Sequence, residues 1–200
     1  MKQRRKLVVA TTNEKKKREL INLLRDLDVK ILTLNDFENP PRVREDKKTF
    51  RENAIKKAVT ISRFTKTLTL AEDSGLQVDA LAGMPGVYSA RFAGPAKSDA
   101  ANIKKLLRLL NGVPFSKRKA RFVCFVAIAD KGRLIKVVNG FVNGLISLCP
   151  KGRFGFGYDP VFYYPPLKKN FAQLPPSVKN KISHRSKALL EAKKILREVF

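Results

Sequence analysis

The sequence of 200 residues contains no tryptophan, one histidine, two cysteines and only 17 acidic residues against 42 lysines and arginines. A single histidine argues against a metal site built from several histidines, and Cys124 and Cys149 lack metal-ligand spacing. No apolar run approaches the roughly 20 residues of a membrane helix. The apolar stretch behind the basic N-terminus, residues 7–10, is too short for a signal peptide. We expect a cytoplasmic protein without a membrane segment, whose two thiols are reduced and packed in apolar surroundings.

The net charge of +25 (42 − 17) attracts anions of any kind, so nucleic acid, nucleotides and lipid headgroups all qualify as partners. The basic residues recur along the whole chain, without an RGG repeat, finger-type Cys/His spacing or an RNP-like aromatic pattern. We therefore expect most of this charge to be solvated surface. A basic nucleic-acid-binding protein stays open as an alternative, and otherwise any contact with nucleic acid should be non-specific.

The first half of the chain predicts alternating strands and helices. Residues 6–10 and 68–71 are short apolar runs typical of buried strands, and the second strand is expected to end at Glu72-Asp73. Asn13 is expected to cap the first helix, and a Thr-x-x-Glu capping box at Thr49 the second. Both strands then deliver polar residues at their C-terminal ends, where open α/β sheets hold ligands.

The second half of the chain begins with the period of strands. Residues 121–129 and 134–142 are β-rich and joined by Asp130-Lys131-Gly132, which predicts a hairpin, with a further strand near 145–148. A last amphipathic helix is expected from about His184. The sequence therefore predicts the α/β class, with one mixed sheet flanked by helices and the hairpin region as a second lobe.

Three groups of residues suit phosphate chemistry, and each has a plainer explanation. Thr11-Thr12-Asn13-x-x-Lys16 joins strand to helix, where backbone N–H groups and a lysine favour a phosphate chain, although an ordinary capped helix looks the same. Asp73 could hold Mg²⁺ while substrate phosphates complete its shell, or bond its own turn. Glu45 lies among basic residues and is either a second metal-side carboxylate or a partner in surface ion pairs.

Two further segments suit a flat, oxygen-rich ligand. Gly155 to Pro160 combines glycines, which permit close backbone approach, with aromatic rings that stack on bases, yet a plain hairpin turn would also fit. Ser183-His184-Arg185 offers charge-assisted donors to ligand oxygens, while the alternative is an N-cap followed by exposed basic residues. The lack of a G-x-S-x-G elbow and of a Walker loop argues against a serine hydrolase and a P-loop NTPase.

These segments, taken in order with three more, resemble the inosine triphosphate pyrophosphatase or Ham1 family over nearly the whole chain. The added segments are Thr49-Phe50-x-Glu52-Asn53-Ala54-x-x-Lys57, Glu72-Asp73-Ser74-Gly75-Leu76 and Pro85-Gly86-Val87-Tyr88-Ser89-Ala90-Arg91. The resemblance implies one nucleoside-triphosphate pyrophosphatase domain over residues 1–200, with an elongated sheet and a central substrate cleft between two lobes. The β-rich hairpin at about 119–149 is expected to form one lobe.

The resemblance also implies a Mg²⁺-dependent homodimeric enzyme that hydrolyses ITP, dITP and XTP to the monophosphate and pyrophosphate, and so removes deaminated purines from the nucleotide pool. A housecleaning pyrophosphatase for other modified nucleotides stays open as an alternative. By matching motifs, the catalytic residues would be Asp73, Lys16 and Lys57, and the metal ligands Asp73 and Glu45. The substrate-binding residues would be Thr11, Thr12, Asn13, Lys16, Ser74, Phe156, Gly157, Tyr158, Asp159, Lys179, His184 and Arg185.

Three places depart from the usual pattern of that family. Thr12 stands where glycine is usual and Glu14-Lys15 where Lys-Gly is frequent, so the phosphate loop is expected to be stiffer. Glu45 is followed by Asp46-Lys47-Lys48 instead of a Thr-Gly pair, which makes it the less secure of the two metal ligands. Asn143 replaces a frequent acidic residue, and the sequence gives no reason for this.

The resemblance leads to two expectations about mechanism. The ordinary pKa of an aspartate, about 3.9, makes Asp73 a weak base, so it should act beside the metal or gain basicity from neighbouring Glu72. Hypoxanthine and xanthine carry an oxygen at C6 where adenine carries an amino group, so donors near His184-Arg185 and the Tyr158-Asp159 backbone would select the first two bases. Phe156 would stack on any base.

Overall fold

The computed structural model describes residues 5–199, so most of the basic N-terminal stretch noted above lies outside the described residues. The chain forms two compact units, each assembled from separate segments. Unit 1 comprises Met1–Asp73, Cys124–Gly140 and Arg185–Phe200, and unit 2 comprises Ser74–Val123 and Phe141–His184. Within the described residues, no helix is long and apolar enough to cross a membrane.

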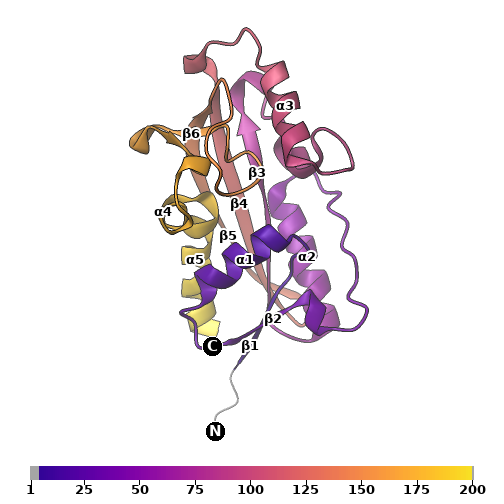
Figure 1. The fold of residues 1–200 in the computed structure, drawn as a ribbon. Coiled ribbons are helices and arrows are strands. Elements are labelled where there is room, and N and C mark those ends of the chain that lie inside the picture. Colours follow the sequence, from indigo (N-terminus) through magenta and orange to yellow (C-terminus); the bar gives the residue numbers. More distant parts are fainter. Residues whose placement is uncertain (1–4, 200) are drawn as a thin grey trace. The chain divides into compact units, whose positions relative to one another are not determined.

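The strands form one seven-stranded mixed sheet in the order β2-β1-β3-β4-β5-β6-β7, with helices flanking it (Figure 1). β1 pairs in parallel with β2 and β3, whereas β6 pairs antiparallel with β5 and β7. The predicted α/β class is therefore confirmed. The strands are β1 (Lys6–Val9), β2 (Lys30–Thr33), β3 (Thr69–Val78), β4 (Lys119–Asp130), β5 (Arg133–Ile146), β6 (Phe162–Tyr164) and β7 (Lys169–Asn170). The helices are α1 (Glu14–Leu24), α2 (Phe50–Thr65), α3 (Asp99–Leu109), α4 (Pro176–Ile182) and α5 (His184–Val199).

Unit 1 packs helices on both faces of its part of the sheet. Successive residues of a strand point to opposite faces, so one strand can contribute to two cores. Leu7 and Val9 of β1, with Leu70 of β3, pack in one cluster with residues of α1 and α5. Val8 and Ala71 pack in the other cluster with residues of α2.

The core of unit 2 lies between α3 and a single face of the strands. Phe122, Val142 and Phe162, from β4, β5 and β6, are buried in one cluster with Leu106 of α3. The ring centroids of Phe122 and Phe162 lie 4.4 Å apart. This cluster fixes the strands from which the loops of unit 2 depart.

Local cap and turn signals are confirmed. The Asn13 side chain accepts a hydrogen bond from the Lys16 N–H at 3.1 Å, and the Thr49 hydroxyl accepts one from the Glu52 N–H at 3.1 Å. The hairpin between β4 and β5 turns at Lys131-Gly132, whose φ values of 47° and 85° are both positive, as a type I′ turn requires. The hairpin is divided between the two units, with Cys124–Gly140 in unit 1 and the residues on either side of this range in unit 2.

Two strands are longer than the sequence predicted. β3 runs past Glu72-Asp73 as far as Val78, because apolar residues resume after Ser74-Gly75 and are buried in the core of unit 2. β5 continues through Gly144 instead of breaking there. A Cβ at this glycine would clash with the carbonyl oxygen of Tyr163 on β6, so the missing side chain permits the close approach of the two strands.

The two cysteines are free thiols, as predicted, but only one is packed. Cys124 is fully buried in β4. Cys149 is exposed, which corrects the expectation of apolar surroundings for both. The reason is its position, because it follows the end of β5 in the loop before Pro150.

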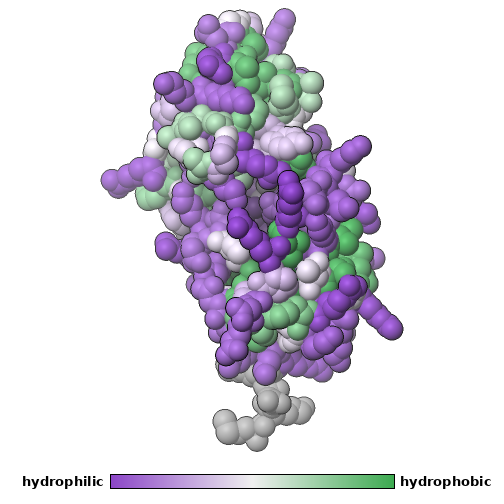
Figure 2. All heavy atoms as spheres, turned by 90° about the vertical axis from the view of Figure 1, so that its right-hand side faces the viewer, coloured by the Kyte–Doolittle hydropathy of each residue, from purple (hydrophilic) through white to green (hydrophobic). Residues whose placement is uncertain are grey.

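The positive charge lies at the surface. Of the lysines and arginines that the structure describes, only Arg118, Lys179 and Arg185 are buried. Figure 2 shows one face of the molecule, on which long hydrophilic side chains project outward and hydrophobic residues form small groups. Most of the charge is therefore solvated, as the sequence predicted.

Candidate functional site

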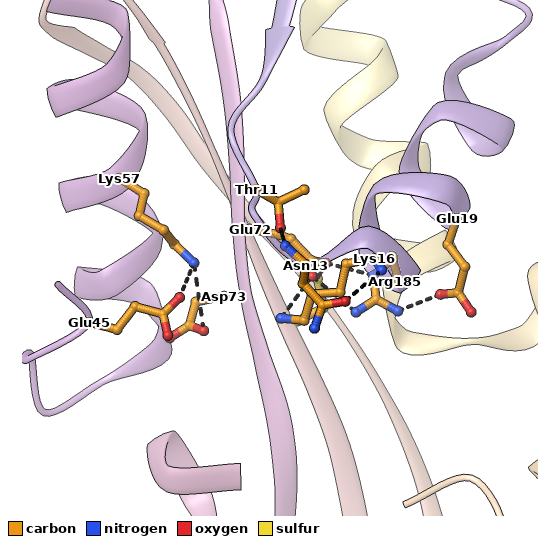
Figure 3. A network of polar contacts seen from close by, with 10 residues as sticks. Thr11, Asn13, Lys16, Glu19, Glu45, Lys57, Glu72, Asp73 and Arg185 are labelled. Atoms are coloured by element: carbon orange, nitrogen blue, oxygen red, sulfur yellow. Dashed lines mark hydrogen bonds and ion pairs between the residues drawn. The ribbon is translucent and has the colours of Figure 1, made fainter. Parts of the chain in front are cut away.

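Glu72 and Asp73 are neighbours on β3 whose side chains lie on opposite faces of the sheet (Figure 3). Glu72 shares the face of Leu70, toward α1 and α5, while Asp73 shares the face of Ala71, toward α2. Both carboxylates are largely removed from solvent, with 1% and 6% of each residue exposed. Consecutive residues therefore serve two separate polar clusters.

Glu72 is the centre of a buried ion-pair network. Arg185 Nε donates to Glu72 Oε2 at 2.7 Å and Arg185 Nη2 to Oε1 at 3.0 Å, while Lys16 Nζ lies 3.1 Å from Oε1. The Cys124 thiol donates to the same carboxylate at 3.1 Å, and Arg185 Nη1 donates to Glu19 at 2.5 Å. Burial opposes ionisation of Glu72, but Arg185 and Lys16 outweigh it and hold its pKa well below the ordinary value.

The start of α1 places Lys16 beside this carboxylate. The Asn13 cap fixes the first turn, and the Asn13 N–H donates in turn to the Thr11 hydroxyl at 3.2 Å. Thr12 is exposed next to it. Burial disfavours the charged form of Lys16, yet the neighbouring carboxylates, Glu72 foremost, raise its pKa above the ordinary value. The lysine therefore stays cationic at the helix N-terminus, where anions are favoured.

On the other face of the sheet, Lys57 lies between two carboxylates (Figure 3). Its Nζ is 2.5 Å from Glu45 Oε1 and 3.9 Å from Asp73 Oδ1. Burial raises the pKa of Asp73; Lys57 and Lys16 oppose this rise, and Glu45 adds to it. Glu72, suggested by the sequence as a source of basicity, lies on the other face of the sheet, and burial is the foremost cause of the raised pKa of Asp73.

Helix α2 holds the segment that carries Glu45. Asn53 is buried in the first turn of α2, where its side chain accepts from the Lys47 N–H at 2.9 Å and donates to the Lys47 carbonyl at 3.4 Å. Lys56 Nζ donates to the Arg44 carbonyl at 3.0 Å. The segment is therefore anchored on both sides of Glu45, although its sequence departs from the usual pattern.

Glu45 and Asp73 are the candidates for metal ligands. Within residues 5–199, no group of three or more His, Cys, Asp or Glu is placed to hold a metal ion. The two carboxylates offer oxygen donors only, which Mg²⁺ prefers, and Mg²⁺ is usually held by one or two carboxylates with water and substrate phosphates. The pair therefore fits a magnesium ion that binds together with a phosphorylated substrate.

In unit 2, Asp159 closes the predicted aromatic loop. Its Oδ2 accepts from the Phe156 N–H at 2.8 Å and pairs with Lys179 Nζ at 2.5 Å. A Cβ at Gly155, whose φ is +75°, would clash with the same carboxylate. Lys179 Nζ lies 4.9 Å from the ring centroid of Phe156, so the cation, the ring and the carboxylate form one cluster.

Two other predicted residues of unit 2 are held by packing. His184 stacks on Phe122, with ring centroids 4.7 Å apart and planes inclined by 12°. The Tyr158 hydroxyl donates to the Ser89 carbonyl at 2.9 Å, and burial, followed by Asp99, raises the pKa of Tyr158 well above its ordinary value. Both rings are fixed in place, and Tyr158 is a neutral anchor of the loop.

Some residues of these clusters were not foreseen. Asp99, at the start of α3, accepts from the Gly157 N–H at 3.0 Å and so supports the aromatic loop. Glu19 lies one helical turn beyond the predicted lysine of α1, a spacing that could have indicated it. Asn53 belongs to a motif that the sequence analysis quoted, but no role was predicted for it. Nothing in the sequence indicated that Cys124 bonds to Glu72.

The structure brings most predicted residues into two groups. Unit 1 holds Thr11, Asn13, Lys16 and Arg185 on the Glu72 face of the sheet and Glu45, Lys57 and Asp73 on the other face, and unit 2 holds Phe156, Gly157, Tyr158, Asp159, Lys179 and His184. Ser74 is half-buried on β3. A mixed sheet that carries lysines and carboxylates at β3 and just after β1 defines an α/β protein whose polar clusters suit phosphorylated ligands.

Comparison with known proteins identifies the family of this α/β protein. The chain matches the Ham1 family over residues 7–195 and belongs to it, which confirms the resemblance. It is 50% identical to a dITP/XTP pyrophosphatase of Desulforamulus reducens over 195 residues, 98% of this chain and 97% of the relative. It is 51% identical to a dITP/XTP pyrophosphatase of Geobacillus kaustophilus over 185 residues, 92% and 91% of the two chains.

Solved structures agree with this assignment. A HAM1 protein from Coxiella burnetii matches with a TM-score of 0.88 at 39% identity, covering 97% of this chain and 99% of that one. The Ham1 protein of Staphylococcus aureus matches with a TM-score of 0.87 at 38% identity, covering 98% and 100%. The fold is therefore that of the family over nearly its full length.

Proposed function

We propose that the protein hydrolyses the deaminated purine nucleoside triphosphates ITP, dITP and XTP to the monophosphate and pyrophosphate, and so clears them from the nucleotide pool. The observation that carries this proposal is the buried Asp73 carboxylate beside Lys57 and Glu45, in a chain about half identical to dITP/XTP pyrophosphatases. The cationic start of α1 supplies the complementary site for a phosphate chain.

The phosphate end of the substrate is assigned to unit 1. Lys16 and the N–H groups at the start of α1, next to Thr11 and Thr12, bind the phosphate oxygens. When bound, Mg²⁺ would be held by Asp73 and Glu45 and would neutralise part of the negative charge of the phosphates. Lys57 balances the two carboxylates from the α2 side.

Asp73 is the proposed proton acceptor. A water oxygen attacks the α-phosphorus, its proton passes to an Asp73 carboxylate oxygen, and the bond from the α-phosphorus to the bridging oxygen breaks. Pyrophosphate leaves with that electron pair, and Lys16 and Lys57 offset the charge that develops on it. Burial supports this role because it raises the pKa of Asp73 and so makes the carboxylate a stronger base.

The base is assigned to unit 2 together with the start of α5. Phe156 stacks on the purine, and Asp159 and Lys179 hold the loop that carries it. His184 and the backbone of Tyr158-Asp159, with Gly157 and Ser74, complete the proposed contacts. Arg185 is also assigned to the substrate, because it stands in the Ser183-His184-Arg185 segment that matches the family motif.

Turnover of a nucleotide panel tests the proposal. ITP, dITP, XTP, GTP and ATP are incubated with the protein, with and without Mg²⁺, and the products are separated by ion-exchange chromatography. We expect pyrophosphate and the monophosphate from the first three nucleotides in the presence of Mg²⁺. Release of inorganic phosphate, or a preference for modified pyrimidine or 7-methylguanine nucleotides, would replace the proposal with another housecleaning activity.

The proposal includes a homodimer in the cytoplasm. The chain has a mass of 22.5 kDa, so light scattering coupled to size-exclusion chromatography should report about twice that value, 45 kDa. Binding to DNA or RNA should be weak and fall steeply with salt, because only surface charge supports it. Nanomolar, sequence-selective binding without turnover would favour the nucleic-acid-binding alternative.

A further inference from the structure

The Glu72 network joins three elements through one carboxylate. Lys16 comes from α1, Cys124 from β4 and Arg185 from α5, and each directs a hydrogen-bond donor at Glu72. The Glu72 side chain itself has no exposed surface, so it cannot meet a ligand directly. Any effect of this carboxylate on a substrate must therefore pass through one of its partners.

Lys16 is the partner that reaches toward solvent. Its side chain is 16% exposed, whereas that of Arg185 is 2% exposed and also bound to Glu19. A lysine side chain has four rotatable bonds and costs up to about 2 kcal/mol of conformational entropy to hold in one position. An ammonium group has three N–H donors, so one bond to Glu72 can fix its position while the others remain for a phosphate.

The charges of the network also balance. Lys16 and Arg185 carry two positive charges, and Glu72 and Glu19 carry two negative charges. Without Glu72, the ammonium of Lys16 and the guanidinium of Arg185 would face each other in a poorly solvated site and repel. The lysine would then turn outward, away from the start of α1.

We propose that Glu72 is a positioning residue that holds the ammonium of Lys16 at the phosphate site, and that Arg185 and Cys124 fix Glu72 for this task. This inference rests on the proposed function. It gives Glu72 a task separate from that of Asp73, although the two residues are adjacent in the chain. It also predicts that Glu72 acts on affinity for the phosphate chain only through Lys16, whereas Arg185 is assigned to the base end of the substrate.

A double-mutant cycle tests this dependence. The variants are Glu72→Gln, Lys16→Ala and the two combined, and the measurements are KM and kcat for dITP, with calorimetric affinity for inorganic pyrophosphate as a readout independent of turnover. We expect Glu72→Gln to raise KM and weaken pyrophosphate binding about 10- to 100-fold, the range for a hydrogen bond to a charged group. The double variant should be no weaker than Lys16→Ala alone. Fully additive losses would overturn the inference.

A matched control separates positioning from general stability. Asp26 is exposed and pairs with Lys193 and Arg197 of α5, so Asp26→Asn removes a carboxylate contact to the same helix outside the site. It should leave KM and pyrophosphate affinity unchanged. If Asp26→Asn weakened both as much as Glu72→Gln, loss of fold stability would explain the effect and the inference would fail.

A second pair of variants covers the case in which Glu72→Gln does not fold. Cys124→Ser keeps a donor to Glu72 and Cys124→Ala removes it. We expect the alanine variant, and not the serine variant, to raise KM for dITP several-fold, with this rise absent in the Lys16→Ala background. Equal KM values for the two variants would contradict the inference. Absence of dITP turnover in the unaltered protein would instead overturn the proposed function itself.

Discussion

The Asp159–Lys179 ion pair of unit 2 leads to a prediction of large magnitude. The two atoms of the pair lie 2.5 Å apart, and the residues are only 2% and 3% exposed. Asp159→Asn keeps the size of the side chain but leaves the Lys179 ammonium facing a neutral amide. Breaking a buried pair on one side typically costs about 3 to 5 kcal/mol, because the remaining charge stays desolvated. For a chain of this length this lowers Tm by about 6 to 20 °C.

Differential scanning calorimetry measures this loss, and two further variants interpret it. Replacing both members, Asp159→Leu with Lys179→Met, removes both charges and should recover most of the stability. Asp26→Asn breaks a pair whose carboxylate side chain is half exposed, so it should cost less than about 1 kcal/mol. A Tm for Asp159→Asn within about 2 °C of the unaltered protein would refute the reasoning that desolvation dominates this pair.

Four further predictions concern Asp73, Arg118 and Gly144. Asp73→Asn should abolish turnover without lowering Tm, because burial raises the folded pKa of Asp73 above its ordinary value and so disfavours the charged form that the variant removes. The native state holds this proton more tightly than the unfolded chain, so the stability that Asp73 contributes falls as pH rises through the folded pKa. For the same reason an NMR titration of the Mg²⁺-free protein should give Asp73 a pKa above the ordinary value of an aspartate, and a pKa at or below that value would contradict the assignment. Arg118→Met should lower the free energy of unfolding by about 2 to 4 kcal/mol in urea titrations, since the buried guanidinium donates to three backbone carbonyls, and a loss below 1 kcal/mol would count against it. Gly144→Ala should cost about 1 to 3 kcal/mol in the same titration, because the methyl group meets the Tyr163 carbonyl; an unchanged midpoint would show that β6 can move aside.

The parts of the fold that the sequence predicted are those with local signals. The caps at Asn13 and Thr49 and the turn at Lys131-Gly132 depend on residues within four positions, so the sequence contains the whole determinant. β3 was cut short because Glu72 to Gly75 has the composition of a turn. Its extension lies beyond the pairing with β1, which reaches only Thr69 and Leu70, and depends on the neighbouring strand β4, which is distant in sequence. β2 was missed because it is short and its four residues are exposed or only partly buried.

The candidate site also has a part that the sequence predicted and a part that it did not. The resemblance indicated Glu45, Lys57 and Asp73, and the structure places them together. The network on the other face was not foreseen, since Glu72 meets Cys124 and Arg185 across 52 and 113 residues of chain. No spacing rule connects such residues. Only the strand alternation, once the true length of β3 is known, shows that Glu72 and Asp73 serve different faces.

The alternation of β3 also limits how the length of this strand can change in evolution. Deleting one residue from Thr69–Ala71 would turn every following side chain to the opposite face, so the two acidic residues would exchange partners. The aspartate would then meet the guanidinium of Arg185, and the glutamate would meet Lys57. Insertions or deletions before Glu72 are therefore expected to be tolerated only in steps of two residues.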